Sequence, residues 1–250
     1  MFPIKDENPH FLTPVVTWGL IAANAAVWLL VQGLGTRPAI LDSVCHLGLI
    51  PGELLGNAAA GSVELGPAYP CPLGEPAWIT VVSSMFLHGG WGHLLGNMWF
   101  LWIFGNNVED SMGHLRFLVF YLLCGVAAAA FQVLSAPDST IPMVGASGAI
   151  GGVMGAYIVL YPRVRVHLLL WLGFYVSTMV VPAFFMLGYW FLIQLLLGAV
   201  APSGGGGVAF WAHVGGFAAG ALLVLAFRDP ALVRRHPHYG WRGTRLAGRL

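Results

Sequence analysis

The hydrophobic residues of this chain fall into long runs that are separated by shorter polar segments. A helix needs about 20 apolar residues to cross the hydrocarbon core of a bilayer. The region 167–181 is apolar but interrupted, so the run that follows it makes the better fifth helix. We therefore expect an all-α polytopic membrane protein, a six-transmembrane-helix bundle with spans at about 14–32, 90–104, 115–134, 142–161, 182–200 and 208–227.

The polar segments divide the chain into a short N-terminal segment (1–13), the membrane domain (14–227) and a basic tail (228–250). A long connection, 33–80, joins the first two spans. Within it, Ile40–Leu55 fits either short amphipathic helices at the membrane interface or an ordinary loop. Cys45 and Cys71 both lie in this connection, as a disulfide or as two unrelated thiols.

Composition and charge agree with a membrane protein and give it an orientation. The chain is 58% hydrophobic and 8% charged, whereas soluble domains carry about 25% charged residues. With six spans, both termini lie on one side of the membrane. Of the basic residues, only Arg37 lies on the other side. Because basic residues collect in the cytoplasm, both termini are expected there and the long connection faces outward. Arginine-rich, lysine-poor usage suggests a prokaryotic plasma (inner) membrane. The basic residues on the terminal side are Lys5, Arg116, Arg163, Arg165, Arg228, Arg234, Arg235, Arg242, Arg245 and Arg249.

A serine set among glycines is the strongest candidate for chemistry. Ser147 lies in Met143-Val-Gly-Ala-Ser-Gly-Ala-Ile-Gly-Gly-Val-Met-Gly155. Glycine costs about 1 kcal/mol per helical residue relative to alanine, so these glycines need a reason. Either another helix approaches closely, or a catalytic serine needs space. Small-residue faces that allow such an approach occur on the fourth span and on the sixth, at Gly148, Gly152, Gly216 and Gly220.

Polar residues from three spans are expected at one depth. Ser147 and His213 each lie five residues past the start of a span that enters from outside. At 1.5 Å per residue, both lie roughly 8 Å below those starts. His93 and Asn97 occupy one face of the second span near this level. Histidine can serve as general base for a serine nucleophile, and His93, Asn97 and the Ser147 backbone N–H can stabilise an oxyanion.

Each residue taken singly also has a structural interpretation. A lone histidine in a membrane is usually a hydrogen-bonding structural residue, and a helical serine usually bonds its own backbone. His88 lies outside the second span. We expect it to be a structural residue that ties the preceding loop to the start of that span. His88 and His93 are five apart, no glutamate follows the first, and no third ligand is evident, so a metal site is disfavoured.

The motifs together resemble the rhomboid intramembrane serine proteases. Gly145-Ala-Ser-Gly148 resembles the GxSG nucleophile motif, Ala212-His-Val-Gly-Gly216 the histidine helix, and His88-x4-His93-x3-Asn97 the third motif. The resemblance covers nearly the whole six-span chain. It implies that Ser147 is the nucleophile, that His213 is general base and then acid, and that His93, Asn97 and the Ser147 amide form the oxyanion hole. It also implies substrate entry between the second and fifth spans, beneath a cap that moves aside. We assign this cap to the flexible glycine segment 203–207.

Two departures from the family pattern concern how the site is supported. Some relatives place an aromatic ring beneath the histidine four residues after the serine, where this chain has Gly151. The Trp-Arg pair often found in the first loop is missing, since Arg37 is followed by Pro38.

The resemblance implies transmembrane protein substrates in the lipid bilayer, cleaved near the outer face. We expect no cofactor, no metal and no nucleic-acid partner, and the oligomeric state stays open. Two alternatives remain. One is a catalytically inactive relative that binds membrane clients. The other is a small transporter, which predicts inverted repeats and paired charges at the midplane.

Overall fold

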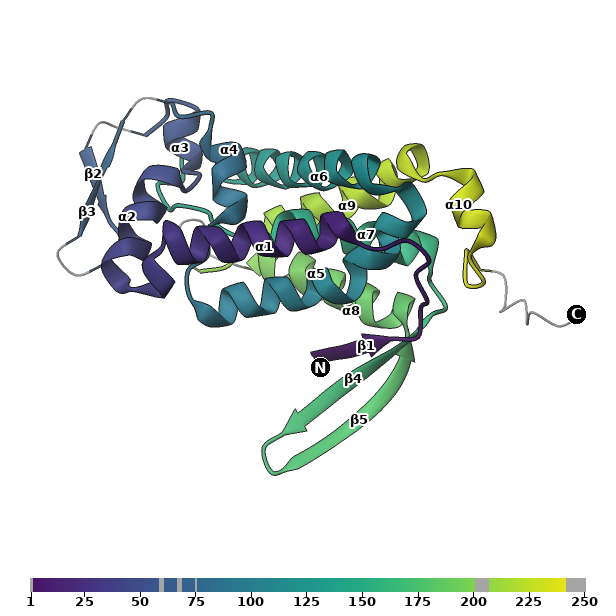
Figure 1. The fold of residues 1–250 in the computed structure, drawn as a ribbon. Coiled ribbons are helices and arrows are strands. Elements are labelled where there is room, and N and C mark those ends of the chain that lie inside the picture. Colours follow the sequence, from purple (N-terminus) through teal and green to yellow (C-terminus); the bar gives the residue numbers. More distant parts are fainter. Residues whose placement is uncertain (1, 59–60, 67–68, 75, 201–206, 242–250) are drawn as a thin grey trace, which may run out of the picture.

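A computed structural model describes residues 2–58, 61–66, 69–74, 76–200 and 207–241 (Figure 1). The helices are α1 (Val15–Leu30), α2 (Arg37–Leu47), α3 (Pro51–Leu54), α4 (Thr80–Ser83), α5 (Trp91–Met112), α6 (His114–Ser135), α7 (Ser147–Leu160), α8 (Ala183–Val200), α9 (Phe210–Phe227) and α10 (Pro230–Arg235), with 3-10 turns at Gly33–Gly35 and Ser84–Phe86. The strands are β1 (Phe2–Asp6), β2 (Gly61–Glu64), β3 (Pro70–Leu73), β4 (Arg165–Leu172) and β5 (Tyr175–Pro182).

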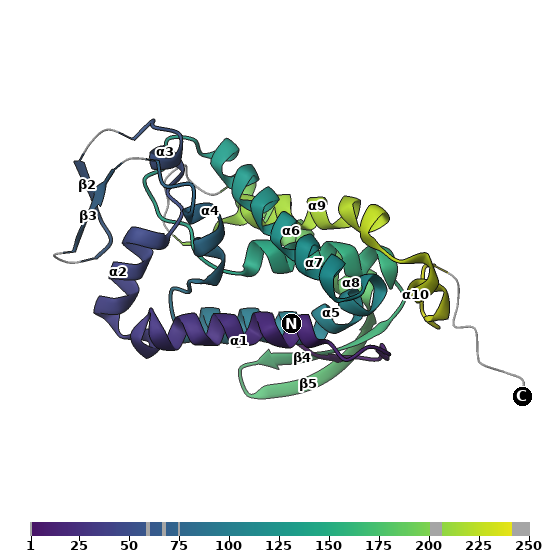
Figure 2. The same cartoon turned by 45° about the horizontal axis from the view of Figure 1, so that its top comes forward.

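Each of the six predicted runs contains a helix, and these helices form the body of the molecule. Helices α1, α5, α6, α7, α8 and α9 lie side by side in both views (Figures 1 and 2). Three of them, α6, α8 and α9, are long and apolar enough to cross a membrane. Helices α1 and α7 are also apolar but shorter, with 16 and 14 residues. The chain is therefore a membrane protein.

Two helix boundaries differ from the prediction. Helix α7 begins at Ser147 and not near Pro142, because Gly145 adopts a positive φ of 127°, which interrupts a helix. Helix α5 continues to Met112, eight residues beyond the predicted 104. Its last turns carry Glu109 and Asp110, charged residues that the apolar pattern excluded.

Those two acidic residues are buried because they anchor the N-terminal segment. The Glu109 carboxylate accepts hydrogen bonds from the Val16 and Thr17 N–H groups, at 2.9 and 2.8 Å. It thereby satisfies backbone donors at the start of α1 that have no helical partner. Asp110 accepts from the Phe11 and Leu12 N–H groups in the same way. The beginning of α1 is thus fixed against the end of α5.

The apolar region 167–181 is a β-hairpin, so the expectation of an all-α protein is wrong in this part. Strands β4 and β5 pair antiparallel around a two-residue turn, and Gly173 supplies the positive φ of 63° that the turn needs. Strand β1 pairs with the other edge of β4, giving a sheet of order β1-β4-β5. The β-branched and aromatic residues of Tyr175–Pro182 favour this extended form. The protein is mostly helical, with a small sheet at one end of the bundle.

The long connection between α1 and α5 is folded as well. Of the two interpretations of Ile40–Leu55, the structure shows the helical one, as α2 and α3. Strands β2 and β3 form a hairpin beside them. Cys45 of α2 and Cys71 of β3 form a disulfide, which ties this hairpin to the helix.

Candidate active site

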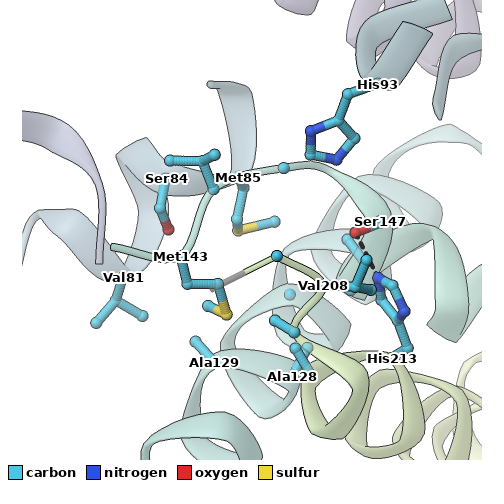
Figure 3. Close-up of a pocket in the computed structure, with 18 residues that line it drawn as sticks. Val81, Ser84, Met85, His93, Ala128, Ala129, Met143, Ser147, Val208 and His213 are labelled. Atoms are coloured by element: carbon cyan, nitrogen blue, oxygen red, sulfur yellow. Dashed lines mark hydrogen bonds between the residues drawn. The ribbon is translucent and has the colours of Figure 1, made fainter. Parts of the chain in front are cut away.

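Ser147 and His213 are brought together by α7 and α9. The Ser147 Oγ lies 2.8 Å from the His213 Nε2, within hydrogen-bond distance (Figure 3). Ser147 is the first residue of α7, and His213 is the fourth residue of α9 and is buried. The predicted depth of the serine inside its helix is wrong, since the helix starts at the serine itself. The expected meeting of the two side chains nevertheless occurs.

Glycines permit this meeting because they let the two helix backbones touch. A Cβ added at Gly216 would overlap the Gly148 carbonyl, and one added at Gly220 would overlap the Gly152 carbonyl. Gly155 faces the Phe217 carbonyl in the same way. Any larger residue at these positions would push α9 away from α7. The small-residue faces read from the sequence are therefore the contact surface that sets the Ser147–His213 distance.

The position of Ser147 at the N-terminus of α7 makes its backbone N–H a hydrogen-bond donor for an anion. The first N–H groups of a helix have no intrahelical acceptor, and the helix dipole places partial positive charge there. Ser147 occupies this position. Its backbone N–H therefore points out of the helix, where it can meet developing negative charge.

His93 and Asn97 lie on α5, facing the same space. The His93 Nδ1 accepts a hydrogen bond from the Gly89 N–H at 3.3 Å. The neutral ring then carries its proton on Nε2, the atom beside Gly145. The Asn97 Nδ2 is buried, and it has no hydrogen-bond partner among the described residues. Buried donors are seldom left unpaired, so the Asn97 Nδ2 is available to a ligand. His93 is exposed, and its ring can meet the same ligand.

Two cavities meet at these side chains, and His93, Ser147 and His213 line both. One, of about 270 Å³, extends beneath the segment 143–145 towards Val208 (Figure 3). The other, of about 210 Å³, lies between α5 and α8. The site can thus be reached from the end of the bundle and from its side. Of the predicted glycine cap at 203–207, all but Gly207 lies outside the described residues.

His88 supports the entrance to α5 without facing the serine. Its backbone N–H donates to the Gln32 Oε1 at 2.8 Å, and its carbonyl accepts from the Gln32 Nε2 at 2.9 Å, which links it to the end of α1. Its ring packs edge-on against His93, with centroids 5.1 Å apart. Burial lowers the pKa of His88 to about 3, so the ring is neutral. Within the described part of the chain, no three His, Cys, Asp or Glu side chains gather to hold a metal.

Two residues at the site were not predicted from the sequence, and both lie on α8. The Gln194 Oε1 is 2.8 Å from the His213 Nδ1, and the Trp190 ring lies 5.7 Å from the imidazole, tilted by 39°. One signal could have found Gln194. It is a polar side chain inside an apolar span, and such residues usually face a cavity or a polar partner.

Comparison with known proteins places the chain in a family. Residues 75–230, more than half of the chain, match the model of the Rhomboid domain. The chain belongs to the rhomboid family. The resemblance seen in the sequence motifs is thereby confirmed.

Relatives from plants and bacteria agree with this assignment. RHOMBOID-like protein 5 of Arabidopsis thaliana is 29% identical over 173 residues, which are 62% of this chain and 56% of that protein. The putative rhomboid protease YdcA of Bacillus subtilis is 29% identical over 162 residues, 62% of this chain and 68% of that protein. Rhomboid-like protein 11, chloroplastic, of Arabidopsis thaliana is 42% identical over 77 residues, 31% of this chain and 27% of that protein. The match thus spans from about a quarter to two thirds of these relatives.

Proposed function

We propose that this rhomboid is an intramembrane serine endopeptidase that hydrolyses transmembrane protein substrates near the outer membrane face. The observation that carries the proposal is the 2.8 Å contact between the Ser147 Oγ and the His213 Nε2 in a cavity that is also lined by Asn97, whose Nδ2 donor is unpaired among the described residues. A structural serine–histidine pair does not need that donor. A serine hydrolase does, because its intermediate carries an oxyanion.

The first half of the reaction forms an acyl-enzyme. The His213 Nε2 takes the proton of Ser147 as the Oγ attacks the carbonyl carbon of the scissile peptide. The carbonyl oxygen becomes an oxyanion, which accepts hydrogen bonds from the His93 Nε2, the Asn97 Nδ2 and the Ser147 N–H. The tetrahedral intermediate collapses when the His213 imidazolium donates its proton to the leaving amine. The C–N bond breaks and the ester to Ser147 remains.

The second half repeats these steps with water. His213 removes a proton from a water molecule, the hydroxide attacks the ester, and the same donors bind the second oxyanion. The Ser147 Oγ leaves with the proton held by His213, and the new carboxyl terminus is released. This step requires water at Ser147, and the cavity beneath 143–145 supplies a route for it.

The side cavity supports entry of the substrate between α5 and α8. Asn97 and Phe100 line one wall of this cavity and Trp190 and Gln194 the other, with Ser147 at its end. A substrate helix has to unwind locally here, because helical carbonyls are engaged in their own hydrogen bonds.

The membrane arrangement belongs to the same proposal. We assign six crossings within 14–227, both termini in the cytoplasm, and the connection 33–80 at the outer face of a prokaryotic plasma membrane. In support, basic residues from three segments lie around α10 and the residues just after it. The Arg116 Nη1 lies 3.3 Å from the Asp229 Oδ2, and the Arg163 guanidinium lies 5.7 Å from the centroid of the Trp241 ring. The third segment is α10 itself, whose last turn carries Arg234 and Arg235. The tail arginines 242, 245 and 249 lie outside the described residues.

Replacement of Ser147 by alanine tests the activity. We expect purified Ser147→Ala to cleave a model transmembrane substrate at least about a thousandfold more slowly than the natural protein. Ser135→Ala is the matched control, since Ser135 is exposed at the end of α6 and, among the described residues, its hydroxyl bonds only the Gln132 carbonyl. Undiminished cleavage by Ser147→Ala would overturn the proposal. Failure of a fluorophosphonate to label Ser147 in the natural protein would favour the inactive, client-binding alternative.

A further inference from the structure

The His213 imidazole has a hydrogen-bond partner on each nitrogen. Its Nε2 faces Ser147, and its Nδ1 lies 2.8 Å from the Gln194 Oε1. Both His213 and Gln194 are buried, each with 9% of its surface exposed. A polar contact so well buried is expensive to form unless both groups are satisfied, and here each satisfies the other.

The proposed chemistry of the Ser147–His213 pair, the catalytic dyad, requires one particular tautomer of the His213 imidazole. His213 can take the serine proton only if its Nε2 is unprotonated, so the neutral ring must carry its proton on Nδ1. An Nδ1–H in a buried site needs an acceptor, and the Gln194 Oε1 provides one. In Ser-His-Asp enzymes a carboxylate has this role, holding the tautomer and the ring orientation. Among the described residues, no carboxylate bonds His213.

The same helix also replaces the missing aromatic ring. A Cβ added at Gly151 would lie 3.2 Å from the His213 carbonyl and 3.8 Å from the Trp190 ring, so an aromatic side chain has no room there. Trp190 packs against the imidazole from α8 instead. Trp190 and Gln194 are four residues apart, which puts both on one face of α8. One helix thus supplies the packing surface and the acceptor.

We propose that Gln194 is a positioning residue, which fixes the tautomer and orientation of His213, and that Trp190 holds the ring against it. This inference rests on the proposed protease function. It makes the orientation of His213 depend on the position of α8 in the bundle, and α8 is the helix that flanks the side cavity. Helix α8 is the least buried of the three span-length helices, at 22% against 44% for α6 and 39% for α9. Displacement of α8 would leave the Nδ1–H without its acceptor.

Two substitutions at Gln194 separate positioning from packing. Gln194→Leu keeps the approximate size of the side chain but removes the acceptor. We expect kcat to fall by about ten- to a hundredfold, with KM for a transmembrane substrate changed less than about twofold, because Gln194 acts through His213. Gln194→Glu restores an acceptor and is expected to retain activity. Since its carboxylate accepts best when ionised, the ratio of its kcat to that of the natural protein should rise with pH.

The matched control is a second glutamine beside α9. The Gln132 Oε1 accepts from the Ala212 N–H at 3.2 Å and bonds neither nitrogen of the imidazole. Gln132→Leu therefore tests general loss of an amide at this helix, and its pH–rate profile should match that of the natural protein. Unchanged kcat in Gln194→Leu would overturn the inference. If Gln194→Leu does not fold, a ratio of the Gln194→Glu kcat to that of the natural protein that does not change with pH would overturn the inference. Cleavage by Ser147→Ala would contradict the protease proposal instead.

Discussion

A single glycine shows how closely the dyad depends on helix packing. A Cβ at Gly220 would overlap the Gly152 carbonyl, and a helix backbone cannot yield as a flexible side chain can. We expect Gly220→Ala to force α7 and α9 apart, at a cost on the order of 1–3 kcal/mol in unfolding free energy. The separation lengthens the Ser147–His213 contact, so cleavage should fall at least about tenfold. Thermal unfolding in detergent and the substrate assay measure the two effects.

Gly188 offers the matched control for this substitution. It also lies inside a membrane helix, but nothing lies within 4 Å of a Cβ placed there. Alanine is the better helix former by about 1 kcal/mol, so Gly188→Ala should keep or slightly raise the unfolding temperature and leave cleavage unchanged. Equal losses in both variants would show that helix packing at Gly220 is not what holds the dyad.

At the scale of elements, the sequence pattern predicted the helices better than their ends. Ser147 and His213 could be paired because their spans enter from the same side and carry matching small residues. The start of α7 could not be found, since it depends on one backbone angle at Gly145. The hairpin of β4 and β5 is apolar throughout, and an unbroken apolar run does not distinguish a strand from a buried helix. Gln194 was missed because its partner is 19 residues away on another helix.

The seating of strand β1 is expected to depend on pH through Asp6. The Tyr157 hydroxyl donates to the Asp6 carboxylate at 2.5 Å, and burial raises the pKa of Asp6 from 3.8 to about 6. The docked strand therefore binds a proton more tightly than the free strand. The contribution to docking is fully present below pH 3.8 and is lost as the pH rises through about 6. This difference corresponds to on the order of a hundredfold in the docking equilibrium.

Amide hydrogen exchange of residues 4–6 measures this docking, after correction for intrinsic exchange rates. Protection should be greater at pH 5 than at pH 7.5, and Asp6→Asn should reduce the difference. His167 of β4 contacts Glu7, the residue after β1, at 2.7 Å, so His167→Gln serves as the control that keeps the Asp6 effect. Protection in Asp6→Asn that varies with pH as strongly as in the natural protein would rule out Asp6 as the titrating group.

At the scale of the whole molecule, contacts bring both ends of the chain to the same end of the bundle. The His236 Nε2 lies 2.8 Å from the Pro9 carbonyl, and the Asp229 N–H donates to the Ser111 carbonyl at the end of α5. An even number of crossings places two termini on one side, so these contacts support six spans. The basic residues near this end favour the cytoplasm. In the proposed topology, the disulfide between Cys45 and Cys71 lies on the outer, oxidising side.

The natural cysteines make this orientation easy to test. Cys45 and Cys71 are paired, and Cys124 is fully buried in α6, so all three are shielded from a thiol reagent. A cysteine introduced at Asp138, in the exposed turn after α6, should react with a membrane-impermeant maleimide on intact cells. One introduced at Arg235, exposed on α10, should react only after the membrane is opened. Labelling of Arg235→Cys on intact cells would reverse the topology and put Ser147 near the inner face, because α7 begins at the end of the bundle opposite to α10.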